Sequence, residues 1–504
     1  MSMSRRNFVG LIGAAAAGTA IAPLGQLQAR VAAASGPSIT PTQLTSFTVP
    51  GFGPLQPTLP NNTSSLGAYA GTKMLSLPAG FEYTAISLVG DTMSDGSLVP
   101  GNHDGMAVFQ APGGNNVLVR NHERNAGTSM SGTFPPNGKV YDDFAAPGTV
   151  GAGGTTNVIV DRDGMVVRDY VSLAGTIRNC AGGPTPWGSW ITCEENVTTV
   201  GGGTPAATKM HGYNFEVPAW ANEAVDPVPL VDMGRMNHEA VAVDPATGYC
   251  YETEDRGDSL FYRFVPRRRA NGVGDYAAGG DLYAMVVAPN QTAPDRTQLP
   301  LFNDAGSVDF RGLGRGATGS VLAFLGVPLR VSWVKLEDVD PQDDTLRFEG
   351  HAKGAAVFWR GEGAWEHKGI IYWVNSGAGD AAEGQVMAYD PSRETVTVVV
   401  ESTEENLLDG PDNITVARDG VLYLCEDGSG GTPGDPNYGQ RVVGVDTDGG
   451  LFDFAFNNLN TAEFAGACFA ADGRYFYVNS QGAGITYVIW RSDRRPITLR
   501  GGFV

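Results

Sequence analysis

Acidic side chains in this sequence cluster next to short apolar runs. Several follow such a run directly: Glu123, Glu194, Glu195, Glu254, Asp255, Glu426 and Asp427. Others precede one: Glu239, Glu349, Asp412 and Asn413. Carboxylates held close together raise one another's pKa values, and bound cations relieve that repulsion. Because Ca²⁺ takes several oxygen ligands, the pattern favours calcium, whereas only 6 histidines give little support to a multi-histidine zinc site.

Cys180 lies in the most unusual stretch of the chain, which runs from residue 179 to residue 195. Two adjacent glycines and two prolines fix an irregular backbone there. A thiolate at position 180 could ligate iron, a softer metal than calcium. Chemistry alone favours the simpler interpretation that Cys180 is a small buried residue. His122 and His238 each precede a glutamate, and we expect them to pack behind it rather than bind metal.

The elements that position these side chains form a repeat of two short apolar strands joined by a turn with Asp, Gly or Asn. Copies occupy 106–119, 157–164 in part, 240–251, 355–374, 414–425 and 467–478. Each copy reads as a β-hairpin. Hairpins in series without long helices predict an all-β chain folded as a β-propeller, with a β-sandwich or two β domains as the alternative. Segments rich in Gly, Pro and Asp would be irregular insertions: 201–235, 266–330 and 428–440.

Hairpin geometry predicts where the polar clusters meet. The residue before the first strand and the residue after the second lie at the same end of a hairpin, and the turn lies at the other end. In a propeller these ends face one central opening. We therefore expect the acidic side chains of separate blades to converge there, where cations would make their proximity tolerable.

The N-terminus predicts export. Paired arginines, Arg5 and Arg6, precede a weakly apolar Gly/Ala stretch from Gly10 to Ala22, as in twin-arginine signals. That stretch is short for a bilayer span, which weakens the alternative of a membrane anchor. A cut near Ala34 would leave residues 35–504 as a single domain. We expect residues 1–34 to be read by the twin-arginine export machinery and the mature protein to be periplasmic or secreted, without a stable membrane span.

Charge and cysteine content limit the partners. A net charge of −20 argues against nucleic acid, and a phosphorylated substrate would need bound cations to reverse the local sign. Five cysteines are too few for a disulfide scaffold, and their odd number leaves at least one unpaired. We expect a monomer that acts on a small molecule.

The stretch at 179–195 resembles the signature of PhoX-type alkaline phosphatases. Other motifs of that family recur in order along most of the chain: His103-Asp104-Gly105-Met106, Arg120-Asn121-His122-Glu123, His238-Glu239-Ala240, Thr253-Glu254-Asp255, Arg347-Phe348-Glu349-Gly350 as the family's R-x-E-G, Gly384-Gln385-Val386 and Pro411-Asp412-Asn413. Each is weak alone, but their order is specific. One departure is the unfamiliar run at 361–366.

The resemblance implies a six-bladed propeller with a mixed site of Fe³⁺ and Ca²⁺ ions. It implies that Cys180 ligates iron and that carboxylates complete the metal coordination: Glu123, Glu195, Glu239, Glu254, Glu349 and Asp412. Because these assignments rest on motif register, the neighbours Glu194 and Asp255 are also candidates. It assigns phosphate binding to Arg347, with Asn157 assisting.

The resulting prediction is an exported alkaline phosphatase-type phosphomonoesterase. No serine or threonine stands in a recognisable nucleophile motif, which favours attack by water. One alternative is a calcium-dependent lactonase on a similar propeller, which would need neither Cys180 nor a phosphate-binding arginine. The other is a non-catalytic propeller that calcium merely stabilises.

Overall fold

The structure is a computed structural model that describes residues 36–127, 132–144, 152–287, 301–302, 306–429 and 439–499. The chain separates into two compact units, Met1–Gly36 and Pro37–Val504. All elements below belong to the second unit. The predicted export signal at residues 1–34 lies outside the described residues.

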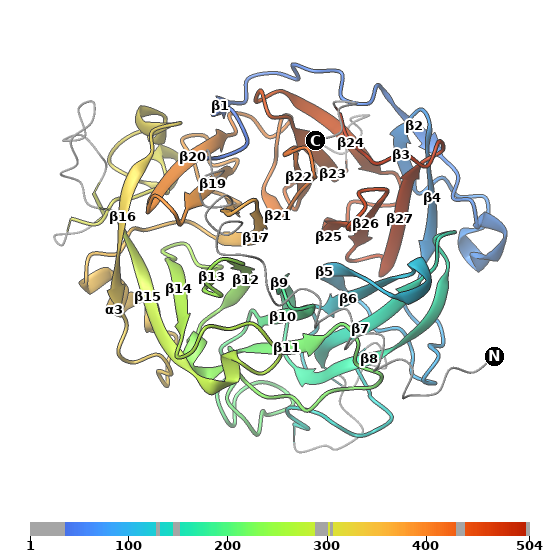
Figure 1. Cartoon of the computed structure of the whole chain (residues 1–504), viewed down its shortest axis with the longest axis horizontal. Helices are drawn as coiled ribbons and strands as arrows, with labels where there is room; N and C mark the ends of the chain where they lie inside the picture. Colours follow the sequence, from blue (N-terminus) through green and yellow to red (C-terminus); the bar gives the residue numbers. More distant parts are fainter. Residues whose placement is uncertain are drawn as a thin grey trace, which may run out of the picture. The chain divides into compact units, whose positions relative to one another are not determined.

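The strands of the second unit divide into six blades around a common centre (Figure 1). Blade 1 contains β5 (His103–Gln110), β6 (Asn116–His122), β7 (Gly153–Val160) and β8 (Val166–Thr176). Blade 2 contains β9 (Asn179–Pro184), β10 (Ser189–Glu194) and β11 (Asn214–Pro218). Blade 3 contains β12 (His238–Val243), β13 (Cys250–Glu254), β14 (Phe261–Pro266) and β15 (Gly280–Val287). Blade 4 contains β17 (Gly361–His367), β18 (Ile370–Asn375), β19 (Gln385–Asp390) and β20 (Thr395–Glu401). Blade 5 contains β21 (Pro411–Val416), β22 (Leu422–Glu426), β23 (Arg441–Val445) and β24 (Leu451–Asn457). Blade 6 contains β25 (Phe464–Phe469), β26 (Tyr475–Ser480) and β27 (Ile485–Arg491). The predicted all-β propeller is confirmed.

N-terminal strands complete the outer edges of the last blades. β4 (Phe81–Ile86) pairs antiparallel with β27 and so becomes the fourth strand of blade 6, with Phe81 opposite Arg491. β3 (Leu75–Pro78) pairs with β24, and β2 (Leu55–Thr58) pairs with β3. The ring is therefore closed by hydrogen bonds between the two ends of the described chain.

Two further strands tie neighbouring parts of the ring together. β16 (Leu329–Lys335) pairs with β15 of blade 3 and with β20 of blade 4, which joins these blades into one ten-stranded sheet. β1 (Thr42–Gln43) runs parallel to the end of β20. A short helix, α3 (Leu346–Ala352), follows β16.

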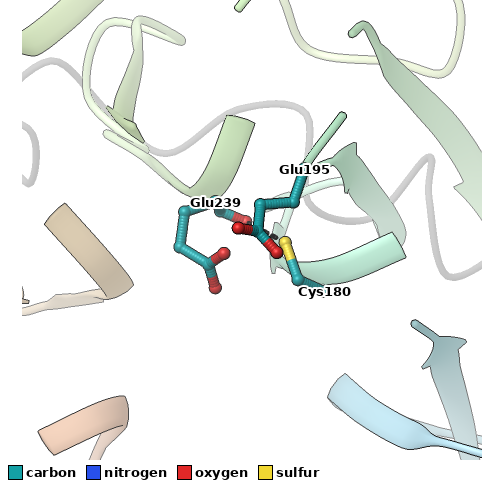
Figure 2. Close-up of side chains that lie close together, drawn as sticks. All are labelled: Cys180, Glu195 and Glu239. Carbon is teal, nitrogen blue, oxygen red and sulfur yellow. Dashed lines mark hydrogen bonds between the residues drawn. The ribbon is translucent and has the colours of Figure 1, made fainter. Parts of the chain in front are cut away.

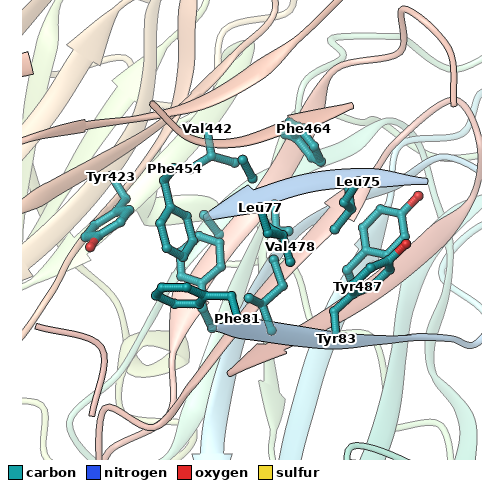
Figure 3. Close-up of a cluster of buried hydrophobic side chains, with 14 of the residues drawn as sticks. Leu75, Leu77, Phe81, Tyr83, Tyr423, Val442, Phe454, Phe464, Val478 and Tyr487 are labelled. Carbon is teal, nitrogen blue, oxygen red and sulfur yellow. The ribbon is translucent and has the colours of Figure 1, made fainter. Parts of the chain in front are cut away.

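Hydrophobic side chains fill the spaces between blades. Figure 3 shows the cluster between blades 5 and 6, to which β3 and β4 also contribute. Tyr423 packs edge to face against Phe454 with ring centroids 5.1 Å apart, and Phe454 packs similarly against Phe476. Because both faces of a middle strand meet such packing, β18 and β22 are buried along their whole length. This explains why these segments read as nearly continuous apolar runs rather than as alternating patterns.

The turns follow the sequence signals. Gly164 and Gly420 follow Asp163 and Asp419 in hairpin turns and have φ of 75° and 89°, a region that glycine enters without strain. All five cysteines are buried and free, as the absence of a disulfide scaffold predicts. Among the described residues, no helix is both long and apolar enough to cross a bilayer.

Candidate functional site

One backbone hydrogen bond recurs in all six blades and fixes the rim of the central opening. The N–H of the residue after the second strand donates to the carbonyl of the residue before the first strand, at 2.9 to 3.2 Å. The six pairs are Glu123 with Asn102, Glu195 with Arg178, Asp255 with Asn237, Ser376 with Arg360, Asp427 with Gly410, and Gln481 with Glu463. The rim predicted from hairpin geometry is therefore present in every blade.

A β-bulge at the start of each innermost strand supplies a second ring of residues. In all six blades the strand pairing skips near the start of the innermost strand, one residue later in blade 6 than in the other five. The first residues inside the skipped stretches are Asp104, Cys180, Glu239, Glu362, Asp412 and Gly466. Bulges re-aim side chains, and here they turn these toward the propeller axis.

Together the two rings enclose a cavity of about 460 Å³. Nine carboxylates and two arginines line it, with one thiol: Asp104, Glu123, Glu195, Glu239, Asp255, Glu362, Asp412, Asp427, Glu463, Arg178, Arg360 and Cys180. The remaining lining residues all come from blade 6: Thr461, Ala462, Gln481 and Gly482. The cavity thus carries a large excess of negative charge.

Glycines close the inner strands together next to the cavity residues. A Cβ on Gly105 would lie 2.5 Å from the Cα of Ala181 in the next blade, and one on Gly363 would lie 2.8 Å from the Cα of Asn413. A Cβ on Gly466 would lie 2.4 Å from the carbonyl oxygen of Asp104. Only glycine permits such backbone contact between neighbouring blades.

Two groups within the cavity have donor sets suited to metal ions. Atoms of Cys180, Glu195 and Glu239 lie within 4.8 Å of one another, as Figure 2 shows for these three side chains. Oxygen atoms of Glu239, Glu362 and Asp412 form a second group within the same distance. Glu239 belongs to both, so the two groups adjoin. The first offers sulfur and oxygen, and the second offers oxygen alone.

The carboxyl groups of the cavity favour the protonated form when no cation is bound. Burial, reinforced by Glu362, Asp412 and Glu195, raises the pKa of Glu239 well above its ordinary value. Burial likewise raises the pKa of Asp412 and of Glu362 well above the usual range, and the pKa of Glu195 to about 7. These carboxylates can all be ionised together at neutral pH only beside cations.

The two arginines flank blade 3 on the rim. A nitrogen of Arg178 contacts Glu195 and lies 2.5 Å from Glu123, whereas Nε of Arg360 donates to Asp255 at 2.8 Å and its Nη2 lies 3.0 Å from Glu362. Both arginines have positive φ, 49° and 48°, a strained conformation for residues with a Cβ. Each therefore holds its guanidinium over the cavity at a backbone cost.

Five of the predicted site residues come together in the cavity: Cys180, Glu123, Glu195, Glu239 and Asp412. Cys180 is both a small buried residue, with 5% of its surface exposed, and part of a potential metal group. Its Sγ also donates to the carbonyl of His238 at 3.4 Å. The ring of His238 bonds to the Gly234 carbonyl, and that of His122 bonds to Gly101 and Thr156. Both histidines thus lie behind the cavity, as expected.

The structure does not bring Glu254, Glu349 or Arg347 to the cavity. Glu254 is buried inside blade 3, where it accepts a hydrogen bond from Tyr262 at 2.7 Å. Arg347 lies on α3 and donates to Asp258 and Asp344 at 2.7 and 2.9 Å. Glu349, also on α3, accepts from the backbone of residues 337 and 338 and pairs with Lys353.

Asn157 also lies elsewhere. It is fully buried on β7 within blade 1. Its Nδ2 donates to Tyr170 at 3.3 Å and to the carbonyl of Ala219 at 3.2 Å. These contacts tie blade 1 to the segment after β11, and they give Asn157 a packing role.

The sequence contains a second R-x-E-G run, and this run reaches the cavity although the family resemblance assigned phosphate binding to Arg347 in the first. The sequence contains the pattern at Arg347–Gly350 and again at Arg360–Gly363. The second run leads directly into the innermost strand of blade 4, so Arg360 and Glu362 take the rim and bulge positions. Its place before a hairpin was the signal that could have identified it. Among the other charged lining residues, Asp255 and Asp427 were expected at the rim, Asp255 only as an alternative metal ligand and Asp427 with no metal role, and three were not singled out as site residues: Asp104, Arg178 and Glu463.

Comparison with known proteins identifies the family of the chain and agrees with its fold. The sequence matches the family model described as alkaline phosphatase PhoX over residues 56–167 and 152–484. No curated protein matches the chain. The structure of Pseudomonas fluorescens PhoX in complex with vanadate, a transition state analogue, superposes with a TM-score of 0.60 at 16% identity, covering 84% of this chain and 97% of that one. A catalytically inactive virginiamycin B lyase from Staphylococcus aureus with quinupristin gives a TM-score of 0.38 at 10% identity, covering 81% and 99%.

Proposed function

Because the chain belongs to the alkaline phosphatase PhoX family, we propose that it hydrolyses phosphate monoesters in the central cavity. The observation that carries the proposal is the meeting of Cys180, nine carboxylates and two arginines in one cavity. The likeness to a PhoX that holds vanadate supports the fold on which this arrangement depends. A lactonase would need neither the thiol nor the arginines, which makes that alternative less suited to this site.

The donor sets fit the metals that we propose. Cys180, Glu195 and Glu239 combine a soft sulfur with carboxylate oxygens, which suits iron as Fe³⁺. Glu239, Glu362 and Asp412 offer only hard oxygen donors, which suit Ca²⁺. Glu123, Asp104, Asp255 and Asp427 are available to complete further coordination. When bound, such cations supply Lewis acidity and positive charge that favour a phosphoryl transition state.

The chain's own residues would orient the substrate. Arg178 and Arg360 present planar forks of donors that match the non-bridging oxygens of a phosphate. Glu362 raises the pKa of Arg360 further above its ordinary value, so this guanidinium remains charged throughout the range in which the protein is folded. The bulge and rim positions fix these groups before substrate arrives, and such preorganisation lowers the barrier for phosphoryl transfer. We assign no serine as the nucleophile. A water molecule attacks the phosphorus atom of the monoester and the alcohol leaves.

The two R-x-E-G runs offer a direct test. Arg360→Gln should weaken inorganic phosphate binding by about 10- to 100-fold, since charge-assisted hydrogen bonds contribute roughly 1.5–3 kcal/mol each. Titration calorimetry on the metal-loaded protein would measure the dissociation constant. Arg347→Lys serves as the matched control, and its phosphate affinity should stay within about twofold of the parent value. If Arg347→Lys weakened phosphate binding more than Arg360→Gln does, phosphate would instead bind at the first R-x-E-G run.

The cellular context remains part of the proposal. We place the enzyme in the periplasm or outside the cell, as a monomer exported through the twin-arginine machinery by the signal at residues 1–34. Export in the folded state suits a site that is built from all six blades.

A further inference from the structure

One sector of the cavity wall differs from the rest. Thr461, Ala462 and Gly482 are, among the described residues that line the cavity, the ones with neither a charge nor a thiol nor an amide side chain. Thr461 and Ala462 lie in the loop before β25, and Gly482 lies in the turn after β26. In this blade the strand pairing continues through Ala465 and skips only from Gly466, so neither residue adds a long side chain to the ring.

The longer side chains of blade 6 turn away from this sector. Nε2 of Gln481 donates to Asp104 at 3.1 Å and to Glu123 at 3.0 Å, both in blade 1. On the other side, Glu463 lies close to Asp427 of blade 5, and burial together with this neighbour raises the pKa of Glu463 well above its ordinary value. A small, neutral section of wall is left between them.

The two arginines lie across the cavity from that section. Arg178 belongs to blade 2 and Arg360 to blade 4, so they stand on either side of blade 3. In a ring of six blades, blade 3 is opposite blade 6. A phosphate whose non-bridging oxygens meet the two guanidinium groups can direct its ester oxygen toward Thr461, Ala462 and Gly482.

We propose that the organic group of the phosphoester lies against Thr461, Ala462 and Gly482, and that this sector limits the size of the alcohol that can leave. The sector takes a neutral alkyl or aryl group, because its surface consists of two methyl groups, the hydroxyl of Thr461 and backbone, and none of these carries a charge. The five other sectors present charged side chains that an organic group would desolvate at a cost. This inference rests on the proposed phosphatase function.

Gly482 gives a precise steric probe. A Cβ added there would meet one atom within 4 Å, the Cβ of Ala462 at 3.2 Å, and the backbone of Gly482 is outside the left-handed region. Gly482→Val should therefore fold normally while it narrows the sector. Gly272→Val is the matched control, because Gly272 lies in the β14–β15 connection and its added Cβ would meet only Asp275, at 3.7 Å.

The measurement compares a large and a small substrate. We expect Gly482→Val to lower kcat/KM for 1-naphthyl phosphate at least about tenfold more than for methyl phosphate, a typical size effect of a filled pocket. The dissociation constant of inorganic phosphate, which has no organic group, should change less than about twofold. Gly272→Val should leave all three values unchanged.

Of three possible results, the first two would overturn this inference alone, and the third would also overturn the proposed function. Equal losses on both esters, or a parallel loss of phosphate binding, would show that Gly482 does not face the leaving group. A parent protein that hydrolyses both esters, with selectivity unaltered by Gly482→Val, would refute this inference alone. A metal-loaded parent that hydrolyses neither ester would refute the proposed function and this inference with it.

Discussion

At the scale of single residues, adjacent acidic pairs show what the sequence could and could not predict. Three such pairs span the end of a second strand, with the first acid as its last residue: Glu194-Glu195, Glu254-Asp255 and Glu426-Asp427. Successive side chains at a strand end point to opposite sides, so only one acid of each pair can face the cavity. The second acid does so in all three pairs, whereas the first bonds within its own blade, to His211, Tyr262 and Arg441 respectively.

The location of the rim was therefore predictable from the sequence. Which of two adjacent acids faces the cavity was predictable only to within one residue. Motif resemblance selected Glu254 where the structure has Asp255. The same limitation affected the R-x-E-G motif, since a pattern of four residues does not reveal whether it sits on α3 or before β17. Contacts across blades, such as Arg360 with Asp255, decide such cases, and they depend on residues far apart in the sequence.

Cys180 supports a prediction about metal identity. Cys180→Ala should lower bound iron at least about fivefold, because a thiolate ligand is lost, and should leave bound calcium nearly unchanged, because oxygen ligands remain. Elemental analysis of the purified protein gives both values. Cys193→Ala is the control, since Cys193 is equally buried and free but is not among the cavity residues. Undiminished iron in the Cys180 variant would exclude the thiolate as a ligand.

At the scale of elements, the innermost strands depend on how closely they approach one another. Gly183 on β9 is the tightest case, because an added Cβ would lie 1.9 Å from the carbonyl oxygen of Val241 on β12. Such contacts could not be read from the sequence, which marks Gly182-Gly183 only as an irregular stretch. They arise when two blades pack, and they set the distance between Cys180 and Glu239.

Gly183→Ala should accordingly destabilise the protein. Since its backbone is outside the left-handed region, the effect is steric, and forced repacking of this kind costs roughly 1–3 kcal/mol or more. Urea denaturation followed by tryptophan fluorescence would measure the free energy of unfolding. The same substitution at Gly272, where the space is open, should change that free energy by less than about 0.5 kcal/mol. Equal stabilities for the two variants would contradict the tight contact between β9 and β12.

At the scale of the whole molecule, the excess of buried carboxylates should make stability depend on cations. Cations that bind only the folded protein stabilise it by about 2.7 kcal/mol when present at 100 times their dissociation constant. We expect a chelator to lower Tm by several degrees and added Ca²⁺ to restore it, as measured by differential scanning calorimetry. A chelator already saturated with Ca²⁺ should have no effect. An unchanged Tm after verified metal removal would show that the acidic cavity is stable on its own.

The pairing of β4 with β27 has a consequence for biosynthesis. β4 leaves the ribosome early but finds its partner only after β27 has been translated, and the cavity residues extend from Asp104 to Gly482 between them. Contacts between such distant segments form late and slowly. A nascent chain therefore possesses most of its acidic ligands long before it possesses a pocket. The cations that we propose for this pocket would therefore be captured by the finished polypeptide rather than blade by blade during translation.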